Sequence, residues 1–353
     1  MNILLVSPLP PPLGGMGIWT QTLLDYYKEN DEIIFYIVDT SPRWRKIYQT
    51  NSLLRAFGGG IQLIANLISV LRFLSKVDCC HLCTSGSLAL IRDRCILRVC
   101  KLFKKPCIYH IHYGRIPQIE SNNTKEWKIL KKNIKLAKII LPLEVKSEEV
   151  LHKYCTNVLR LPNPIKFLNI CKEKDTKIIT FVGWNIITKG IEDLLEAWQY
   201  IDKHDIWKLQ IIGPGDVNYI NMLKKHYRCE NVVFLGEQEH DRVLDYMKAS
   251  EIFILPSHTE AFPLVVLEAM SLGVAVIGTE VGAIPEMLSD NCGIVIKPKS
   301  PKQIQEALTK FIENEELRHI CGVNAMKKIQ NEYCSNIIFN KLETIWRKCV
   351  DEL

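Results

Sequence analysis

The amino-acid sequence predicts an α/β fold built from two domains, each a parallel β-sheet covered by helices. Short β-rich runs alternate with helical patterns along the whole chain, an alternation typical of parallel sheets. The length of 353 residues suits about two domains. The prolines of Leu161-Pro-Asn-Pro-Ile165 force an extended path, which suits a joint. We therefore expect domains over residues 1–162 and 163–334, and a closing helix over 335–353.

Short runs of β-favouring residues define the expected strands. In the first domain they cover residues 2–7, 32–38, 77–82, 106–112 and 138–142. In the second domain they cover residues 177–182, 208–212, 231–235, 251–255, 275–278 and 293–296. The last segment has apolar residues at helical spacing, namely Ile338, Phe339, Leu342, Ile345 and Trp346. Each domain is therefore expected to be Rossmann-like.

The cysteines indicate a reducing compartment. There are 13 of them, an odd number without a repeated spacing, and the first residues form a strand pattern rather than a secretory leader. The cluster Cys79-Cys80-His81-Leu82-Cys83 has two interpretations, a metal site or core residues of a strand. We favour the core, because no second ligand pair has a matching spacing. The longest uncharged apolar stretch, residues 56–71, is too short to span a membrane, so we expect a cytoplasmic protein without a spanning helix.

Positive charge is concentrated in the first domain. Residues 1–161 carry 23 Lys and Arg against 12 Asp and Glu, although the whole chain has a formal net charge of only +6. The excess peaks around an apolar helical stripe of Trp127, Leu130, Ile134 and Ala137, in the residues Lys125, Lys128, Lys131, Lys132, Lys135 and Lys138. These lysines form the solvated face of a docked helix or a face that attracts anionic lipid, and the two interpretations are compatible. No nucleic-acid motif accompanies them, so we expect no nucleic-acid partner.

Two glutamates with seven residues between them, Glu260 and Glu268, predict a ligand site. A buried strand precedes Glu260, which places it on a loop at the carboxyl edge of a sheet, where ligands bind in open α/β folds. Pro263 suits the first position of a helix and Gly273 suits its end. The N–H groups at the start of that helix attract phosphate. A carboxylate on each side of a phosphate suits a ligand with hydroxyls at both ends, as in a nucleotide sugar.

The pattern Glu-x7-Glu followed by Ala-Met-x-x-Gly resembles the donor-site signature of retaining glycosyltransferases with the GT-B fold, in the family called family 4. The resemblance spans nearly the whole chain and is strongest over residues 178–298. It implies two Rossmann-like domains facing across a cleft, with a final helix that crosses back to the first domain. It also implies that Glu268 holds the ribose hydroxyls and that Glu260 holds the sugar-phosphate end. The residues at the helix start that would bind the phosphates are Phe262, Pro263, Leu264 and Val265.

Two further elements of the second domain are similar to the same family. The segment from Gly183 to Gly190 resembles its Gly-Arg…Lys-Gly element, which implies that Lys189 meets the donor diphosphate. Trp184 stands where the family usually has arginine, so one expected cation is missing. A solvated loop lysine is the alternative interpretation of Lys189. The turn Gly213-Pro-Gly215 resembles a turn beside the nucleotide base, although any strand-to-helix turn can use glycine.

The first domain offers a glycine-rich loop and two histidines. The loop, with Gly15 and Gly17, follows the first strand and precedes a helix expected over 18–27, and the resemblance implies that it faces the sugar diphosphate. It is not Gly-x-Gly-x-x-Gly, which disfavours a nicotinamide site. Strand alternation puts His110 and His112 on one face, and His112 alone reaches the following loop. We favour His112 as a residue that positions the donor sugar; a core histidine is the alternative for either.

The resemblance thus implies a retaining glycosyltransferase, and we expect it to move a sugar from a UDP- or GDP-sugar to a hydroxyl of a glycan or a lipid-linked saccharide in cell-surface polysaccharide assembly. Glu260, Lys189 and His112 are the expected catalytic residues. The chain has no Asp-x-Asp motif, so we expect no metal and no other cofactor. A peripheral position on an anionic inner membrane face fits the basic first domain. Two alternatives stay open: a nucleotide-sugar epimerase of similar shape, and a catalytically silent subunit that binds sugar nucleotides.

Overall fold

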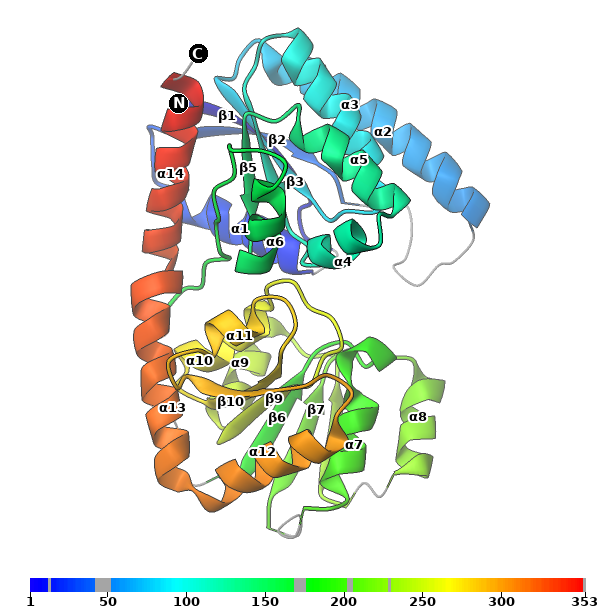
Figure 1. Cartoon of the computed structure of the whole chain (residues 1–353), viewed down its shortest axis with the longest axis vertical. Coiled ribbons are helices and arrows are strands. Elements are labelled where there is room, and N and C mark those ends of the chain that lie inside the picture. The colour runs from blue at the N-terminus through cyan, green and yellow to red at the C-terminus, as the bar shows by residue number, and fades with distance from the viewer. Residues whose placement is uncertain (12–13, 42–51, 168–175, 202–205, 228–229, 352–353) are drawn as a thin grey trace. The chain divides into compact units, whose positions relative to one another are not determined.

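The computed structural model divides the chain into two compact units (Figure 1). It describes all residues except 12–13, 42–51, 168–175, 202–205, 228–229 and 352–353. The first unit consists of Met1–Pro164 and Ile338–Leu353, and the second of Ile165–Ile337. The two sheets of the described residues pair their named strands in parallel throughout.

A five-stranded sheet forms the centre of the first unit, in the order β2-β1-β3-β4-β5. Its strands are β1 (Asn2–Ser7), β2 (Ile34–Asp39), β3 (Cys79–Thr84), β4 (Cys107–Ile111) and β5 (Ile139–Pro142). Its helices are α1 (Gly15–Tyr26), α2 (Ser52–Leu74), α3 (Ala89–Leu102), α4 (Ile116–Ser121), α5 (Lys125–Ile134), α6 (Val145–His152) and most of α14 (Ser335–Asp351). The strands are apolar runs because both faces of a parallel sheet are covered.

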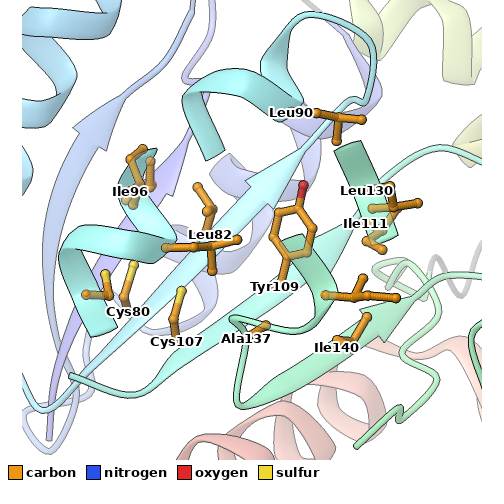
Figure 2. Packing of buried hydrophobic residues seen from close by; sticks show 14 of the residues in the cluster. Cys80, Leu82, Leu90, Ile96, Cys107, Tyr109, Ile111, Leu130, Ala137 and Ile140 are labelled. Carbon is orange, nitrogen blue, oxygen red and sulfur yellow. The ribbon is translucent and has the colours of Figure 1, made fainter. Parts of the chain in front are cut away.

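Alternate strand residues supply two separate cores, one on each face of the first sheet. Leu4 and its equivalents pack with α2, α3 and α5, and Figure 2 shows this core around the buried ring of Tyr109. Ile3 and its equivalents pack with Trp19 of α1 and Trp346 of α14. Successive side chains of a strand point to opposite faces, so every second residue joins the same core.

A six-stranded sheet forms the centre of the second unit, in the order β11-β10-β9-β6-β7-β8. Its strands are β6 (Ile178–Val182), β7 (Lys208–Ile212), β8 (Val232–Gly236), β9 (Ile252–Leu255), β10 (Ala275–Thr279) and β11 (Gly293–Ile296). Its helices are the 3₁₀ turn η1 (Ile187–Lys189), α7 (Ile191–Trp198), α8 (Val217–His226), α9 (His240–Lys248), α10 (Leu264–Ser271), α11 (Ile284–Met287), α12 (Pro301–Glu313), α13 (Glu315–Lys328) and the π turn η2 (Ile329–Tyr333). The chain runs outward from β6 to β8 and returns to β9 on the other side of β6, which makes the β6/β9 junction the switch point of the topology.

The predicted two-domain α/β fold is confirmed. Each predicted strand has a counterpart whose ends differ by at most two residues. The final helix is also present, and from Ile338 onward it belongs to the first unit, where its five predicted apolar residues are buried. The start of the first helix was predicted wrongly: the helix expected over 18–27 begins at Gly15, because Ile18 N–H already donates to Gly14 O at 2.9 Å. Gly15 and Gly17 therefore form the first turn of α1 rather than a loop.

The lysine-rich helix α5 is docked by one face. Trp127 and Leu130 are buried, whereas Lys125, Lys128 and Lys132 are exposed. This confirms the docked-helix interpretation, while the attraction to lipid stays a prediction. Within the part of the chain that the structure describes, every helix is too short or too polar to cross a bilayer.

Candidate functional site

The predicted ligand residues of the second domain lie at the switch point of its sheet. Lys189 lies in η1 after β6, and Glu260 lies in the loop after β9. β6 and β9 are parallel neighbours, so both segments leave the sheet at the same carboxyl edge. The loops after β7 and β10 leave at that edge too, because these strands are parallel to β6 and β9. This edge is the place where open α/β sheets bind ligands.

Backbone hydrogen bonds join these four loops into one structure. Asn185 N donates to Pro214 O at 2.7 Å and links the β6 and β7 loops. His258 N donates to Thr188 O at 2.8 Å and links the β9 loop to the turn that carries Lys189. Ala283 N donates to Ala261 O at 2.8 Å and links the β10 loop to the residue after Glu260. The positions of Lys189 and Glu260 are thus fixed by paired backbone groups.

Two glycines are needed for these contacts. Gly213 has φ +138°, and a side chain there would overlap Gly183 O in the β6 loop. Gly282 has φ +54°, and a side chain there would overlap the carbonyl groups of Glu260 and Ala261. Both conformations strongly favour glycine. The predicted ligand glycines Gly183, Gly213 and Gly215 therefore lie together, and the structure gives them a packing role between loops; a direct role in nucleotide binding stays a prediction.

Lys189 and Glu260 form an ion pair. Lys189 Nζ lies 2.5 Å from Glu260 Oε1, and the hydroxyl of Ser257 donates to the same oxygen at 2.8 Å. The two side chains are 22% and 11% exposed, so the pair is shielded from solvent but within reach of it. A phosphate that approached Lys189 would compete with the carboxylate for the ammonium protons. The arrangement can therefore exchange one anionic partner of Lys189 for another.

Glu268 lies in the second turn of α10, with its side chain only 5% exposed. Burial raises the pKa of this carboxyl group, and the charge of His240 counteracts that shift in part. His240 Nε2 lies 3.8 Å from Glu268 Oε1, beyond hydrogen-bonding distance. A buried carboxylate of this kind is stabilised by hydroxyl donors from a ligand.

The helix start was predicted one residue too early. α10 begins at Leu264, and Pro263 is its N-cap with φ −71° and ψ 114°. The extended ψ angle of Pro263 excludes it from the helix, although its φ angle would fit. Val266 N donates to Pro263 O at 3.1 Å, which leaves the N–H groups of Leu264 and Val265 ahead of the first intrahelical bond. Phe262 is buried against the ring of Tyr333, and Gly273 ends the helix as predicted.

Two histidines of this region were not predicted as site residues. His258 Nε2 lies 2.6 Å from Asp193 Oδ2 of α7 and braces the loop that carries Glu260. His240 is the first residue of α9 and lies beside Glu268. Each follows a strand at the carboxyl edge, so its position along the chain was the available signal. Neither belongs to the motifs on which the prediction was based.

His112 belongs to the first unit, directly after β4. Its backbone N–H donates to Thr84 O at 2.9 Å. The centroid of its imidazole ring lies 4.0 Å from that of His110 and 5.0 Å from that of Trp19 in α1. His110 and His112 do lie on one face, as strand alternation predicted. Burial lowers the pKa of His112 to about 3, so this imidazole is neutral near pH 7. It is suited to hydrogen bonding, not to supplying positive charge.

The tautomers of the neighbouring histidines follow from their partners. Trp346 Nε1 donates to His81 Nδ1 at 3.0 Å, so the neutral His81 carries its proton on Nε2. His81 Nε2 then donates to His110 Nδ1 at 3.1 Å, which puts the proton of His110 on its Nε2. The Nε2 atom of His112 is buried without a hydrogen-bond partner among the described residues. The imidazole of His112 beside Trp19 thus keeps one unpaired nitrogen.

The cysteine-rich segment lies in the core, as predicted. Cys79, Cys80 and Cys83 are all buried in β3. The structure also brings the sulfur atoms of Cys80, Cys100 and Cys107 within 4.8 Å of one another, a grouping that spacing along the sequence did not show. Figure 2 shows Cys80 and Cys107 among aliphatic side chains of that core.

Comparison with known proteins follows the same division of the chain. Residues 166–328 match the family model of the Glycosyl transferases group 1. The capsular polysaccharide biosynthesis glycosyltransferase CapM of Staphylococcus aureus is 28% identical over 232 residues, which cover 58% of this chain and 61% of CapM. The chain therefore matches about three fifths of that relative's length.

Solved structures agree in fold over the whole chain. The sucrose-phosphate synthase of Thermosynechococcus elongatus superposes with a TM-score of 0.80 at 17% identity, covering 99% of this chain and 98% of that one. The HepE protein of Anabaena, solved in complex with UDP, superposes with a TM-score of 0.73 at 14% identity, covering 98% and 99%. Such identities establish the fold alone. The fold of this chain is therefore GT-B, and its residues 166–328 are similar to the Glycosyl transferases group 1.

Proposed function

We propose that this protein is a retaining glycosyltransferase that uses a nucleoside-diphosphate sugar, with UDP or GDP as the nucleotide. The observation that carries the proposal is the grouping of the Lys189–Glu260 ion pair, the buried Glu268 and the start of α10 at one sheet edge. In the ligand-bound state the diphosphate takes the place of Glu260 as the partner of Lys189. The N–H groups of Leu264 and Val265 bind the same diphosphate. Glu268 accepts hydrogen bonds from the ribose hydroxyls, and Glu260, once released, faces the sugar-phosphate end.

The proposed reaction breaks the bond between the anomeric carbon and the diphosphate oxygen and forms a bond from that carbon to the acceptor oxygen, whose proton passes to the departing diphosphate. Negative charge develops on the departing diphosphate, where Lys189 and the N–H groups of α10 stabilise it. His112 is proposed to position the donor sugar as a neutral hydrogen-bonding group. The acceptor is a hydroxyl of a glycan or a lipid-linked saccharide, and this proposal is supported by the role in capsular polysaccharide biosynthesis that CapM's name gives to that relative. We also propose a cytoplasmic protein in peripheral contact with an anionic membrane.

Replacement of Glu268 by glutamine should weaken donor binding by about 10- to 100-fold. The amide removes the charged acceptor, and a hydrogen bond to a charged group contributes about 1.5–3 kcal/mol. Isothermal titration calorimetry with UDP, GDP and their sugar conjugates measures the change. The control is Glu306→Gln on α12, at an exposed glutamate. Unchanged affinity in Glu268→Gln would exclude Glu268 as the ribose ligand, and failure of the wild type to bind any nucleotide sugar would exclude the proposed function.

The same substitution should stabilise the ligand-free protein. Burial raises the pKa of Glu268 in the folded state, so its contribution to stability is present at pH values below its unfolded pKa and is lost as the pH rises through its folded pKa. Near neutral pH the buried charge therefore lowers the free energy of unfolding, and Glu268→Gln removes that charge. The melting temperature of the variant should exceed that of the wild type near neutral pH, and the gap should close in acid.

Transfer should proceed without a divalent metal. The reaction as proposed stabilises the leaving diphosphate with Lys189 and helix N–H groups. Excess EDTA should therefore leave the rate of transfer unchanged. NMR of the product gives its anomeric configuration and so tests retention. Loss of activity in EDTA that magnesium or manganese restores would contradict this prediction. Product formed from the donor alone would instead favour the epimerase, and donor binding without transfer or hydrolysis would favour the silent subunit.

A further inference from the structure

Helix α2 of the first unit has apolar side chains on its exposed face as well as on its buried face. On the buried side, Val70 and Leu74 belong to the core of the first sheet. The exposed residues are Ile61, Ile64, Ile68 and Leu71, which are 57%, 60%, 61% and 46% exposed. Their spacing of three, four and three residues places them along one side of the helix, and we call them the apolar stripe. A helix that is apolar all round is expected to be covered.

A neighbouring helix of the same layer also exposes apolar residues. α2 contacts α3, and α3 contacts α5, so the three helices form one outer layer on the same face of the sheet (Figure 1). α3 and the residue after it add Ile91, Leu102 and Phe103, which are 48%, 78% and 53% exposed. Exposed apolar residues therefore lie on more than one helix of this layer, and apolar surface that is left exposed in this way marks an interaction site.

Among the described residues, the exposed charged side chains of α2, α3 and α5 are all basic. α2 contains no Asp or Glu. Asp93 of α3 is buried and pairs with Arg92 at 2.7 Å, and Glu126 of α5 pairs with Arg115 at 2.7 Å. Among the side chains that the structure describes, the exposed basic residues of the three helices are Arg72, Arg98, Lys101, Lys125, Lys128 and Lys132. An apolar stripe bordered by unopposed positive charge is complementary to a surface of acyl chains under anionic headgroups.

We propose that the layer of α2, α3 and α5 binds the surface of an anionic lipid bilayer, with the apolar stripe inserted at the level of the headgroups. This inference deepens the membrane contact of the proposed function and locates it, and vesicle binding can be measured without donor or acceptor. The stripe supplies the apolar contact, and the basic residues of α3 and α5 supply the electrostatic attraction. A second copy of the chain fits the layer poorly, because a two-fold contact would set its basic residues against their own equivalents.

The test is cosedimentation of the full chain with phosphatidylcholine vesicles that contain or lack phosphatidylglycerol. The wild type should sediment with the phosphatidylglycerol vesicles, and added salt should weaken this binding. Ile64→Glu/Ile68→Glu should lower the partition coefficient by about tenfold or more, because two apolar contacts are lost and two negative charges are introduced. Both positions are largely exposed on a helix that tolerates glutamate, so the fold should be kept.

The matched control is Val217→Glu/Ile320→Glu, which changes two exposed apolar residues of the second unit in the same way; they are 69% and 43% exposed. This variant should bind vesicles like the wild type. The proposal is overturned if the wild type does not bind anionic vesicles, or if the stripe variant binds them equally well. It is also overturned if sedimentation velocity shows a dimer that Ile64→Glu/Ile68→Glu dissociates. The stripe variant should still bind the nucleotide sugar in calorimetry. Loss of vesicle binding with sugar-nucleotide binding kept then concerns this inference, and loss of sugar-nucleotide binding concerns the proposed function.

Discussion

Replacing Lys189 by alanine should lower the rate of sugar transfer by about 100- to 1000-fold, equivalent to about 3–4 kcal/mol of transition-state stabilisation. Lys189 Nζ is held 2.5 Å from Glu260 at the switch point of the second sheet, where the diphosphate is proposed to bind. Trp184 does not supply the second cation expected at this site, so the loss of Lys189 removes the principal side-chain charge of the proposed mechanism. Because the charge on the diphosphate grows as the bond breaks, the effect should fall mainly on kcat and less on KM.

The control for this experiment is Lys208→Ala. Lys208 is exposed at the amino end of β7, on the edge of the same sheet away from the proposed site. Steady-state kinetics of both variants, with thermal unfolding curves to verify folding, separate a catalytic effect from a structural one. A Lys189→Ala variant that kept wild-type kcat would rule out this lysine as the group that stabilises the leaving diphosphate.

The strands could be predicted from the sequence because their information is local. β1, β7 and β11 were predicted with their observed bounds, since a short apolar run between turn residues is enough to define a buried strand. The position of Glu260 at the carboxyl edge followed from the strand before it. These predictions depend on neighbours in the chain and not on tertiary contacts.

The ion pair at the site could not be predicted, because its partners are 71 residues apart in the sequence. Their contact depends on the backbone hydrogen bonds between the loops after β6 and β9. Lys189 and Glu260 were each predicted from a separate sequence element, and neither element indicates that the two side chains meet. The same limit applies to Glu268, whose neighbour His240 comes from another helix. For α2, periodicity shows that a helix is apolar but not which of its faces the rest of the fold leaves exposed.

The first unit should lose stability in mild acid through His81, His110 and His112. Burial lowers the pKa of His81 and of His112 to about 3, and that of His110 lies well below its usual value through burial and then through its two histidine neighbours. In the unfolded chain each histidine titrates near pH 6.5. Below that pH the unfolded state binds more protons than the folded state, so stability falls as the pH falls toward the folded pKa values. From about pH 7.5 to about pH 5.5 each histidine contributes a loss of about 1.4 kcal/mol, or about 4 kcal/mol for the three.

Hydrogen exchange followed by mass spectrometry can measure this loss in each unit separately, from peptides that cover β3 and β4 or β6 and β9. Burial raises the pKa of Asp93 and of Glu144 in the first unit, so these two carboxyl groups increase stability as the pH falls. A variant is therefore needed to isolate the effect of the histidines. His112→Phe keeps a ring beside Trp19 and should reduce the acid-induced loss by about one third. His319→Phe, at an exposed position of α13, is the matched control. If β3 and β4 kept their protection at about pH 5.5, or if His112→Phe and the wild type lost it equally, the neutral histidine cluster would not be the source of acid sensitivity.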